Sequence, residues 1–247
     1  MVCILHFILG DGILNWMNFL LIVFFSTLAL GAGESVSPVM GKALIYNLYP
    51  TQPVAGYREV KRKKKKIQKL ETPDDLEKYF LKNTVPVVIG PLGRRYMIDH
   101  HHFTLAAFQA GFTEVYYKVV DDLSDLSEKQ FWTKMKKKKW TYLKINGEPI
   151  TENQLPRFIK YLIDDPYRSL AGQVKQGGGF TQTQTPFMEF EWADFFRKRI
   201  DPKLVHTDFD KAFEMALEIS RSPAAKHLPG YKGAGLCVDV YRVSSQQ

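Results

Sequence analysis

The residues best suited to chemistry lie in one short run, Met97-Ile98-Asp99-His100-His101-His102. The apolar residues before Asp99 predict a strand, and the polar tetrad after them opens a helix. The first N–H groups of a helix lack intrahelical acceptors and lie at the positive end of its dipole, so they bind phosphate well. A neighbouring imidazole can donate a hydrogen bond or move a proton near neutral pH. The run therefore predicts a phosphate site, and the simplest alternative is Asp99 as an ordinary N-cap beside three exposed histidines.

A metal site is the competing interpretation of the same run. Consecutive residues of a helix point in different directions, so the three histidines cannot all bind one ion. Asp99 and His102, three positions apart, would supply two ligands, with His206 or His227 as a further one. The cofactor class that we consider is Mg²⁺ or another divalent cation, and the residue types leave the metal itself open.

The charge of the chain favours anionic partners. Thirty-four Lys and Arg against 26 Asp and Glu give a formal charge of +8, and the basic residues cluster at 61–66 and at 134 and 136–139. Such clusters suit nucleic acid, nucleotides or an anionic membrane surface. Solvated helix faces are the alternative interpretation, because six successive cations on a helix point in every direction.

The N-terminal segment predicts export. Residues 19–30 form an apolar run that ends in Gly31-Ala32-Gly33, which is typical of a signal peptide and shorter than the roughly 20 residues of a spanning helix. We expect a signal peptide over residues 1–32, a periplasmic or secreted protein, and no stable membrane insertion after cleavage. No Lys or Arg precedes the run, and an uncleaved anchor is the alternative. Two cysteines, Cys3 and Cys237, build no disulfide framework, so no disulfide-linked partner is expected.

The remaining pattern predicts an α/β fold, a small mixed sheet with helices. Strands are expected at 42–48, 85–89, 95–98, 114–120 and 140–145, and helices at 58–70, 73–82, 99–110, from 127 onward, 153–163, 165–176, 187–200 and 208–221. Residues 42–145 would form the α/β core, 146–205 a helical extension packed on it, and 206–247 a C-terminal helix and tail. A glycine-rich and threonine-rich segment, 177–185, would join two of the helices.

Several motifs in order give the chain a resemblance to a known family. They are the segments 48–60 (LYPTQPVAGYREV), 96–102 (YMIDHHH), 164–172 (DDPYRSLAG) and 190–195 (FEWADF). Over residues 40–205 the chain resembles the Putative ParB-like nuclease family of the ParB N-terminal/sulfiredoxin superfamily. The resemblance implies a ParB/sulfiredoxin-like core followed by helices, and phosphate binding at the strand-to-helix loop.

Members of that superfamily include CTP-binding partition proteins, an ATP-dependent sulfinic acid reductase and a free-serine kinase. Their loop often reads Asp-Gly-His-His-Arg. Asp99, His101 and His102 match this pattern, whereas His100 replaces the glycine and Phe103 stands in place of the arginine. Losing that arginine removes a planar, bidentate phosphate donor. The sulfiredoxin cysteine is also absent, which argues against that reaction.

Residues from other segments could also face the pocket. The resemblance implies that Gln52 and Glu59 face the nucleotide, where the carboxylate would act as a base or hold a divalent ion through water. Without the resemblance, they are a turn residue and a first-turn helix residue. Arg168 would replace the missing arginine if the later helices fold back over the loop, and the favoured alternative is an ion pair with Asp164 or Asp165.

Three functions remain open at this point. The first is a phosphate-chemistry enzyme that cleaves phosphodiesters or transfers phosphoryl groups, with Asp99, Glu59, His101 and His102 as catalytic residues. Phosphate would be bound by Gln52, Asp99, His100, His101, His102 and Arg168. The second is a non-catalytic module that binds nucleotide or nucleic acid, and the third is an interaction protein whose motif only stabilises the fold.

Overall fold

The computed structural model describes residues 39–233. The predicted signal peptide, the alternative membrane anchor and both cysteines lie outside these residues. Within the described range, no helix is both long and apolar enough to cross a bilayer.

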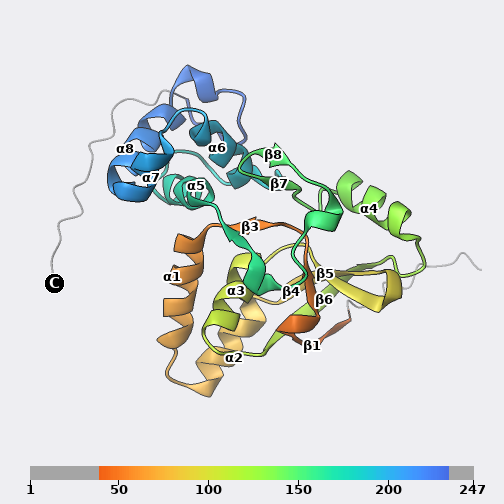
Figure 1. Cartoon of the computed structure of the whole chain (residues 1–247). Helices are drawn as coiled ribbons and strands as arrows, with labels where there is room; N and C mark the ends of the chain where they lie inside the picture. Colours follow the sequence, from red (N-terminus) through yellow and green to blue (C-terminus); the bar gives the residue numbers. More distant parts are fainter. Residues whose placement is uncertain (1–38, 234–247) are drawn as a thin grey trace, which may run out of the picture. The chain divides into compact units, whose positions relative to one another are not determined.

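A five-stranded mixed sheet forms the centre of the first half (Figure 1), and its strand order is β1-β6-β4-β5-β2. The strands are β1 (Met40–Leu44), β2 (Leu48–Pro50), β4 (Val85–Gly90), β5 (Arg94–Met97) and β6 (Glu114–Asp122). β6 pairs antiparallel with β1 and parallel with β4, and β5 pairs antiparallel with β4 and parallel with β2. The fold class is therefore α/β with a small mixed sheet, as the sequence predicted.

The strand expected at 42–48 is divided in two. A 3₁₀ turn at Ile45–Asn47 separates β1 from β2, and the Ile45 N–H donates to the Thr113 carbonyl at 2.8 Å. The sequence pattern did not indicate this break, because Ile45 and Leu48, on either side of it, are both apolar and buried in the same core. The turn carries the chain from one edge of the sheet to the other and places Thr51 beside the end of β5, where its hydroxyl donates to the Met97 carbonyl at 2.6 Å.

Four helices accompany the sheet: α1 (Tyr57–Gln68), α2 (Pro73–Lys82), α3 (His101–Gln109) and α4 (Glu128–Lys137). Side chains cap the N-termini of two of them. The Thr72 hydroxyl accepts from the Asp75 N–H at 3.1 Å, and Ser127 forms a capping box with Gln130. The apolar faces of α1, α2 and α3 join the sheet in one core, whereas α4 covers a smaller cluster around Phe131 and Met135.

The second half is helical. It contains α5 (Pro166–Gln176), α6 (Met188–Arg197), α7 (Pro202–Thr207) and α8 (Phe209–Ser220), which appear in teal to blue in Figure 1. These helices share a core of their own, with Trp192 stacked on Phe180 at a centroid distance of 4.3 Å. The helix α7 was missed, although Asp201 caps it and Pro202 begins it.

Two expected elements after the sheet are wrong. The helix predicted at 153–163 is two 3₁₀ turns, Glu152–Gln154 and Ile159–Tyr161, because Pro156 disfavours helical geometry at the residue before it. The strand predicted at 140–145 is only β7 (Lys144–Ile145), paired with β8 (Glu148–Pro149). The Tyr142 N–H donates instead to the Thr51 carbonyl, which ties this segment to the loop after β2.

Contacts between short segments join the half that contains the sheet to the helical half. β3 (Val54–Ala55) pairs parallel with β9 (Ile163–Asp164), and the start of α1 lies against α5. Gly56 precedes α1 at this point, and a Cβ there would lie 2.9 Å from the backbone nitrogen of Ser169. Glycine therefore permits the close approach that sets α5 over the loop between β2 and α1.

Candidate functional site

A cavity of about 620 Å³ opens where α5 and α6 approach the start of α3. Its wall combines the loop after β2, α1, the β5–α3 junction, the end of α4, α5 and the segment that leads into α6. All seven residues that the sequence singled out lie in its wall: Gln52, Glu59, Asp99, His100, His101, His102 and Arg168. The tertiary structure thus brings together three segments that are far apart in the sequence.

The helix at the centre of the site begins later than expected. α3 starts at His101 and not at Asp99, because His100 takes a left-handed conformation with φ of 63°. The Asp99 carboxylate accepts from the His100 N–H at 2.6 Å, and the His100 ring contacts the Asn83 carbonyl through Nδ1 at 3.0 Å, so this nitrogen carries the proton. Asp99 therefore holds the turn before the helix, and His101 to Phe103, whose N–H groups have no intrahelical acceptors, are among the residues that line the cavity.

The next two imidazoles hold the loop that follows β2. The Thr51 N–H donates to His101 Nε2 at 3.1 Å, and the Gly56 N–H donates to His102 Nε2 at 3.0 Å. Both rings are neutral in this arrangement, because an Nε2 that accepts cannot carry a proton. Burial lowers the pKa of His101 to about 3 and lowers that of His102 well below its usual value.

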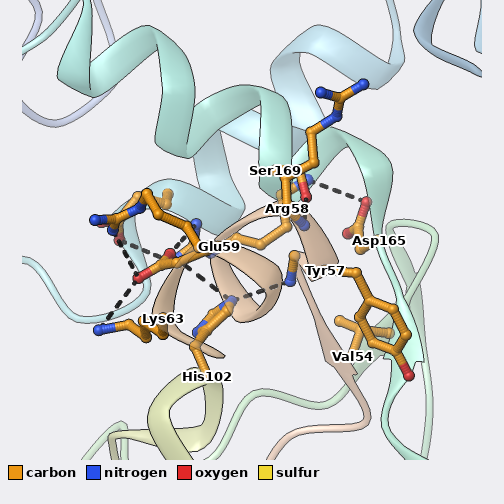
Figure 2. A network of polar contacts seen from close by, with 12 residues as sticks. Val54, Tyr57, Arg58, Glu59, Lys63, His102, Asp165 and Ser169 are labelled. Atoms are coloured by element: carbon orange, nitrogen blue, oxygen red, sulfur yellow. Dashed lines mark hydrogen bonds and ion pairs between the residues drawn. The ribbon is translucent and has the colours of Figure 1, made fainter. Parts of the chain in front are cut away.

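Glu59 lies among cations on the first turn of α1. Its carboxylate is 3.7 Å from Lys63 Nζ, 3.8 Å from Arg168 Nη1 and 4.0 Å from His102 Nε2. Figure 2 shows the His102 ring directed toward both this carboxylate and the backbone at the start of α1. Burial lowers the pKa of Lys63, although the Glu59 carboxylate opposes this effect. Glu59 and Lys63 are thus charged groups held together in the cavity wall.

Arg168 is the least satisfied polar group of the site. Its side chain is 8% exposed, and its guanidinium lies 3.8 Å from Glu59 and 3.9 Å from Glu189, too far for hydrogen bonds. Nε and Nη1 have no hydrogen-bond partner among the described residues. Gly172, one turn later on α5, leaves the space that Nη1 occupies, since a Cβ there would lie 3.3 Å from it.

The ion pair of Arg168 with Asp164 or Asp165 does not form, and its ionic partners are Glu59 and Glu189. Asp165 instead caps α5 through the N–H groups of Tyr167 and Arg168, and its other oxygen pairs with Arg197 at 2.6 Å. Asp164 accepts from the Tyr57 N–H at 2.9 Å. Because both neighbouring carboxylates already have donors, the guanidinium of Arg168 turns to the cavity.

Glu189 completes the charged group from α6. Burial alone would raise the pKa of Glu189, but the Arg168 guanidinium and the Lys175 ammonium together lower it. Lys175 also forms a hydrogen-bonded ion pair with this carboxylate. Glu189 is therefore ionised at neutral pH and already paired, so it does not saturate Arg168.

Two further positions have structural roles. Gln52 is buried, and its side-chain amide donates to the Val54 carbonyl at 2.7 Å, which shapes the loop between β2 and β3. Phe103, which stands where the pattern described above has arginine, is buried against Phe80 at a centroid distance of 5.1 Å. Position 103 therefore faces the core in this chain, and its side chain supplies no donor to a ligand.

Two further segments complete the wall. Lys138 and Lys139, from the basic cluster noted in the sequence, lie in the wall with Trp140 after the end of α4. Sequence reasoning missed residues 182–187 before α6. The signal available was the polar segment 177–185 between two helices, since loops of this kind often carry function. Among the described residues, His100, Lys139 and Phe187 are three of the five non-glycine residues with positive φ, and all three line the cavity. Backbone strain of this kind concentrates at functional sites.

The three-ligand metal site is wrong for the part of the chain that the structure describes. No group of three His, Cys, Asp or Glu side chains between residues 39 and 233 is placed to hold an ion. The nitrogen of His102 that would coordinate a metal accepts the Gly56 N–H instead.

Comparison with known proteins places the chain in a family. The family model described as Putative ParB-like nuclease matches residues 42–198. Protein Atu1540 from Agrobacterium tumefaciens is a solved structure with 38% identity and a TM-score of 0.73, and the match covers 79% of this chain and 99% of that one. The C-terminally truncated chromosome-partitioning protein ParB from Caulobacter crescentus, complexed with CTP-gamma-S, has 12% identity and a TM-score of 0.27, over 75% of this chain and 93% of that one. No curated protein matches the chain.

The matched range contains the whole cavity wall, since the lining residues run from Gln52 to Phe190. The model covers well over half of the sequence, and the Agrobacterium protein is matched over nearly its full length. This chain belongs to the Putative ParB-like nuclease family.

Proposed function

We propose that this protein binds a phosphate-containing ligand, a nucleotide or a nucleic acid, in the cavity between the start of α3 and α5. The observation that carries the proposal is the Arg168 guanidinium, which is buried in the cavity wall with two nitrogens unpaired among the described residues. Buried N–H groups without acceptors are destabilising, and a phosphate would offer the bidentate acceptor that a guanidinium prefers.

The surroundings of Arg168 suit an anion. The first N–H groups of α3 border the same cavity and provide the positive end of a helix dipole. Lys63 from α1 and Lys138 and Lys139 from the end of α4 also lie in the wall. These lysines and Arg168 make four cations against three carboxylates, Glu59, Asp99 and Glu189, so the wall has a net positive charge.

Catalysis, if it follows binding, would use the carboxylates rather than the histidines. Glu59 lies in the wall 3.8 Å from Arg168, where it would accept a proton from water or bind Mg²⁺ or another divalent cation together with the phosphate. Proton transfer by His101 or His102 requires each Nε2 to release its backbone donor first. We therefore propose phosphodiester hydrolysis with Glu59 as the general base.

A non-catalytic binding module is the second candidate. It is favoured by the same two histidine contacts, because they occupy the nitrogens that the predicted acid–base chemistry would use. The assignment of His101 and His102 as catalytic residues stays a prediction, and only activity measurements separate the two candidates.

We also propose export, on the basis of the apolar run at residues 19–30 and the small residues that follow it. Extracellular nucleic acid would then be a more accessible ligand than a free nucleotide. Mass measurement of the protein recovered from the periplasm or the medium tests this proposal: loss of about 32 residues supports it, and full-length protein in the cytoplasm contradicts it.

The experiment for the main proposal combines binding and turnover on the full chain. Thermal shifts with inorganic phosphate, ATP and CTP are measured beside hydrolysis of plasmid and RNA in Mg²⁺, Mn²⁺ or EDTA. Arg168→Met should abolish the thermal shift, whereas Arg221→Met, at the end of α8 and outside the cavity wall, should not. Glu59→Gln should bind but not hydrolyse. An unchanged shift in Arg168→Met would overturn the proposed site, and binding without any hydrolysis would favour the binding module.

A further inference from the structure

A cluster of aromatic rings and cations lies on another surface of the molecule, away from the residues that line the cavity. It joins two segments about 110 residues apart, the 3₁₀ turn after β1 and the 3₁₀ turn before β9. We call this surface the aromatic–cationic patch, and it consists of Tyr46, Tyr49, Arg157, Phe158, Lys160 and Tyr161.

The rings of the patch are fixed by contacts with one another. Tyr46 packs edge-to-face on Phe158 at a centroid distance of 5.4 Å and on Phe108 of α3 at 5.6 Å. Phe158 in turn lies 6.2 Å from Tyr161. The patch is therefore an ordered platform and not a set of independent surface side chains.

Cations lie against these rings and have no acidic partners. The Arg157 guanidinium lies 3.6 Å from the Tyr49 ring centre, and Lys160 Nζ lies 4.8 Å from that of Tyr161. Neither cation forms an ion pair within residues 39–233, and neither segment, 45–49 or 156–161, contains a carboxylate. Arg94, 5.5 Å from the Tyr49 ring, adds a third positive charge.

The exposure of the patch exceeds what the fold requires. Ile159 and Leu162 are the residues that anchor this segment in the core beside α3 and β2, and both are buried. Tyr46 is 42% exposed and Tyr161 is 59% exposed, so they contribute little to that anchoring. Apolar rings left at the surface beside unpaired cations are typical of a binding surface.

We propose that the aromatic–cationic patch binds single-stranded nucleic acid. Unstacked bases have flat faces that stack on exposed tyrosine rings, and the phosphates between them would pair with Lys160, Arg157 and Arg94. A duplex keeps its bases stacked on one another and offers these rings no face. No residue of the patch lines the cavity, so this is a second site. Its proposed function can be tested independently of the proposal for the cavity.

The test is fluorescence anisotropy of a labelled 12-nucleotide single strand with the full chain, at two salt concentrations. The double variant Tyr161→Ala/Lys160→Ala should bind about tenfold more weakly, with a shallower dependence on salt because one phosphate contact is lost. The matched control is Met215→Ala/Lys211→Ala, which removes an exposed apolar side chain and an exposed lysine from α8, and it should bind as the wild type does.

Two further measurements separate a loss of binding at the patch from a general loss of folding. Lys160→Glu retains every ring and should weaken binding more than Lys160→Ala, and all patch variants should keep the thermal shift with inorganic phosphate. Equal affinity in the double variant and the wild type would overturn the proposal. Equal binding of a matched duplex, or patch-dependent binding of phosphatidylglycerol vesicles without binding of the strand, would overturn it as well.

Discussion

The two walls of the cavity differ in whether their polar groups have hydrogen-bond partners within the protein. On the wall made by α3 and the loop after β2, His101 and His102 each accept a backbone N–H, and Asp99 accepts another. On the wall made by α5, the Arg168 guanidinium keeps two nitrogens without partners among the described residues. His101 is 2% exposed and Arg168 is 7% exposed, so a difference in solvent exposure does not explain the contrast between these two residues.

The difference separates residues that build the site from residues left for a ligand. A buried group that is satisfied within the protein stabilises the folded state, whereas a buried group left unsatisfied destabilises it. In the structure, two histidines of the run accept backbone N–H groups from the loop after β2. The arginine, one residue within an ordinary helix pattern, is the group that we propose binds the anion.

Replacing Arg168 gives the largest expected effect. Arg168→Met should weaken binding of the phosphate-containing ligand about 100-fold, because two charge-assisted hydrogen bonds of about 1.5 kcal/mol or more each are lost. The free energy of unfolding should fall by about 1 kcal/mol, since Glu59 and Glu189 lose a cation within 4 Å while the unpaired guanidinium nitrogens are removed. Calorimetric titration and urea unfolding measure the two quantities. Intact binding in this variant would contradict the assignment of Arg168 to the ligand.

Replacing His101 tests the other wall. His101→Ala should lower the free energy of unfolding by about 3 kcal/mol, because it leaves a void and an unsatisfied Thr51 N–H. His101→Gln should recover part of that loss, since its side-chain oxygen can accept the same N–H. His206→Ala, with an exposed imidazole, is the control for urea unfolding. A stable His101→Ala protein that binds ligand but does not turn it over would instead support a catalytic imidazole.

The histidine wall should also make stability depend on pH. The pKa of His101 is about 3 in the folded protein against 6.5 for a free imidazole, so the unfolded chain binds a proton first. Stability is complete above pH 6.5 and declines as the pH falls toward 3, by about 1.4 kcal/mol per pH unit for one imidazole. We expect a loss on the order of 3 kcal/mol at pH 4.5, measured by urea unfolding. His101→Gln should show a flatter profile, and an identical profile would contradict the assignment.

The smallest effect is expected at Gly172, where a substitution should raise the free energy of unfolding and lower the ligand affinity. Gly172→Ala removes a flexible residue from the interior of α5 and should raise the free energy of unfolding by up to about 1 kcal/mol. Its Cβ would approach Arg168 Nη1 to 3.3 Å and displace the guanidinium, so ligand affinity should fall about threefold. Unfolding and titration of one variant measure both, and unchanged affinity would show that the position of Arg168 is not critical.

Local signals predicted the elements well wherever a single side chain completes the local geometry. Thr72, Ser127 and Asp165 each cap the helix that the sequence places after them, because a cap bonds to residues two or three positions away. Prediction failed at 45–47 and 153–163. At the first stretch the Ile45 N–H bonds to Thr113 in another segment, and at the second Pro156 prevents a continuous helix. In both stretches a buried apolar residue lies in a turn, where it gives the same pattern as a strand or helix.

The sequence by itself determined the family motifs, the α/β class and the run that begins α3, since each is carried by residues next to one another or at helical spacing. Only the tertiary structure decided which polar groups remain free. Whether a histidine accepts a backbone N–H, or an arginine lacks a partner, depends on segments more than 40 residues away. The aromatic–cationic patch arises in the same way, because its two halves meet only when the chain packs.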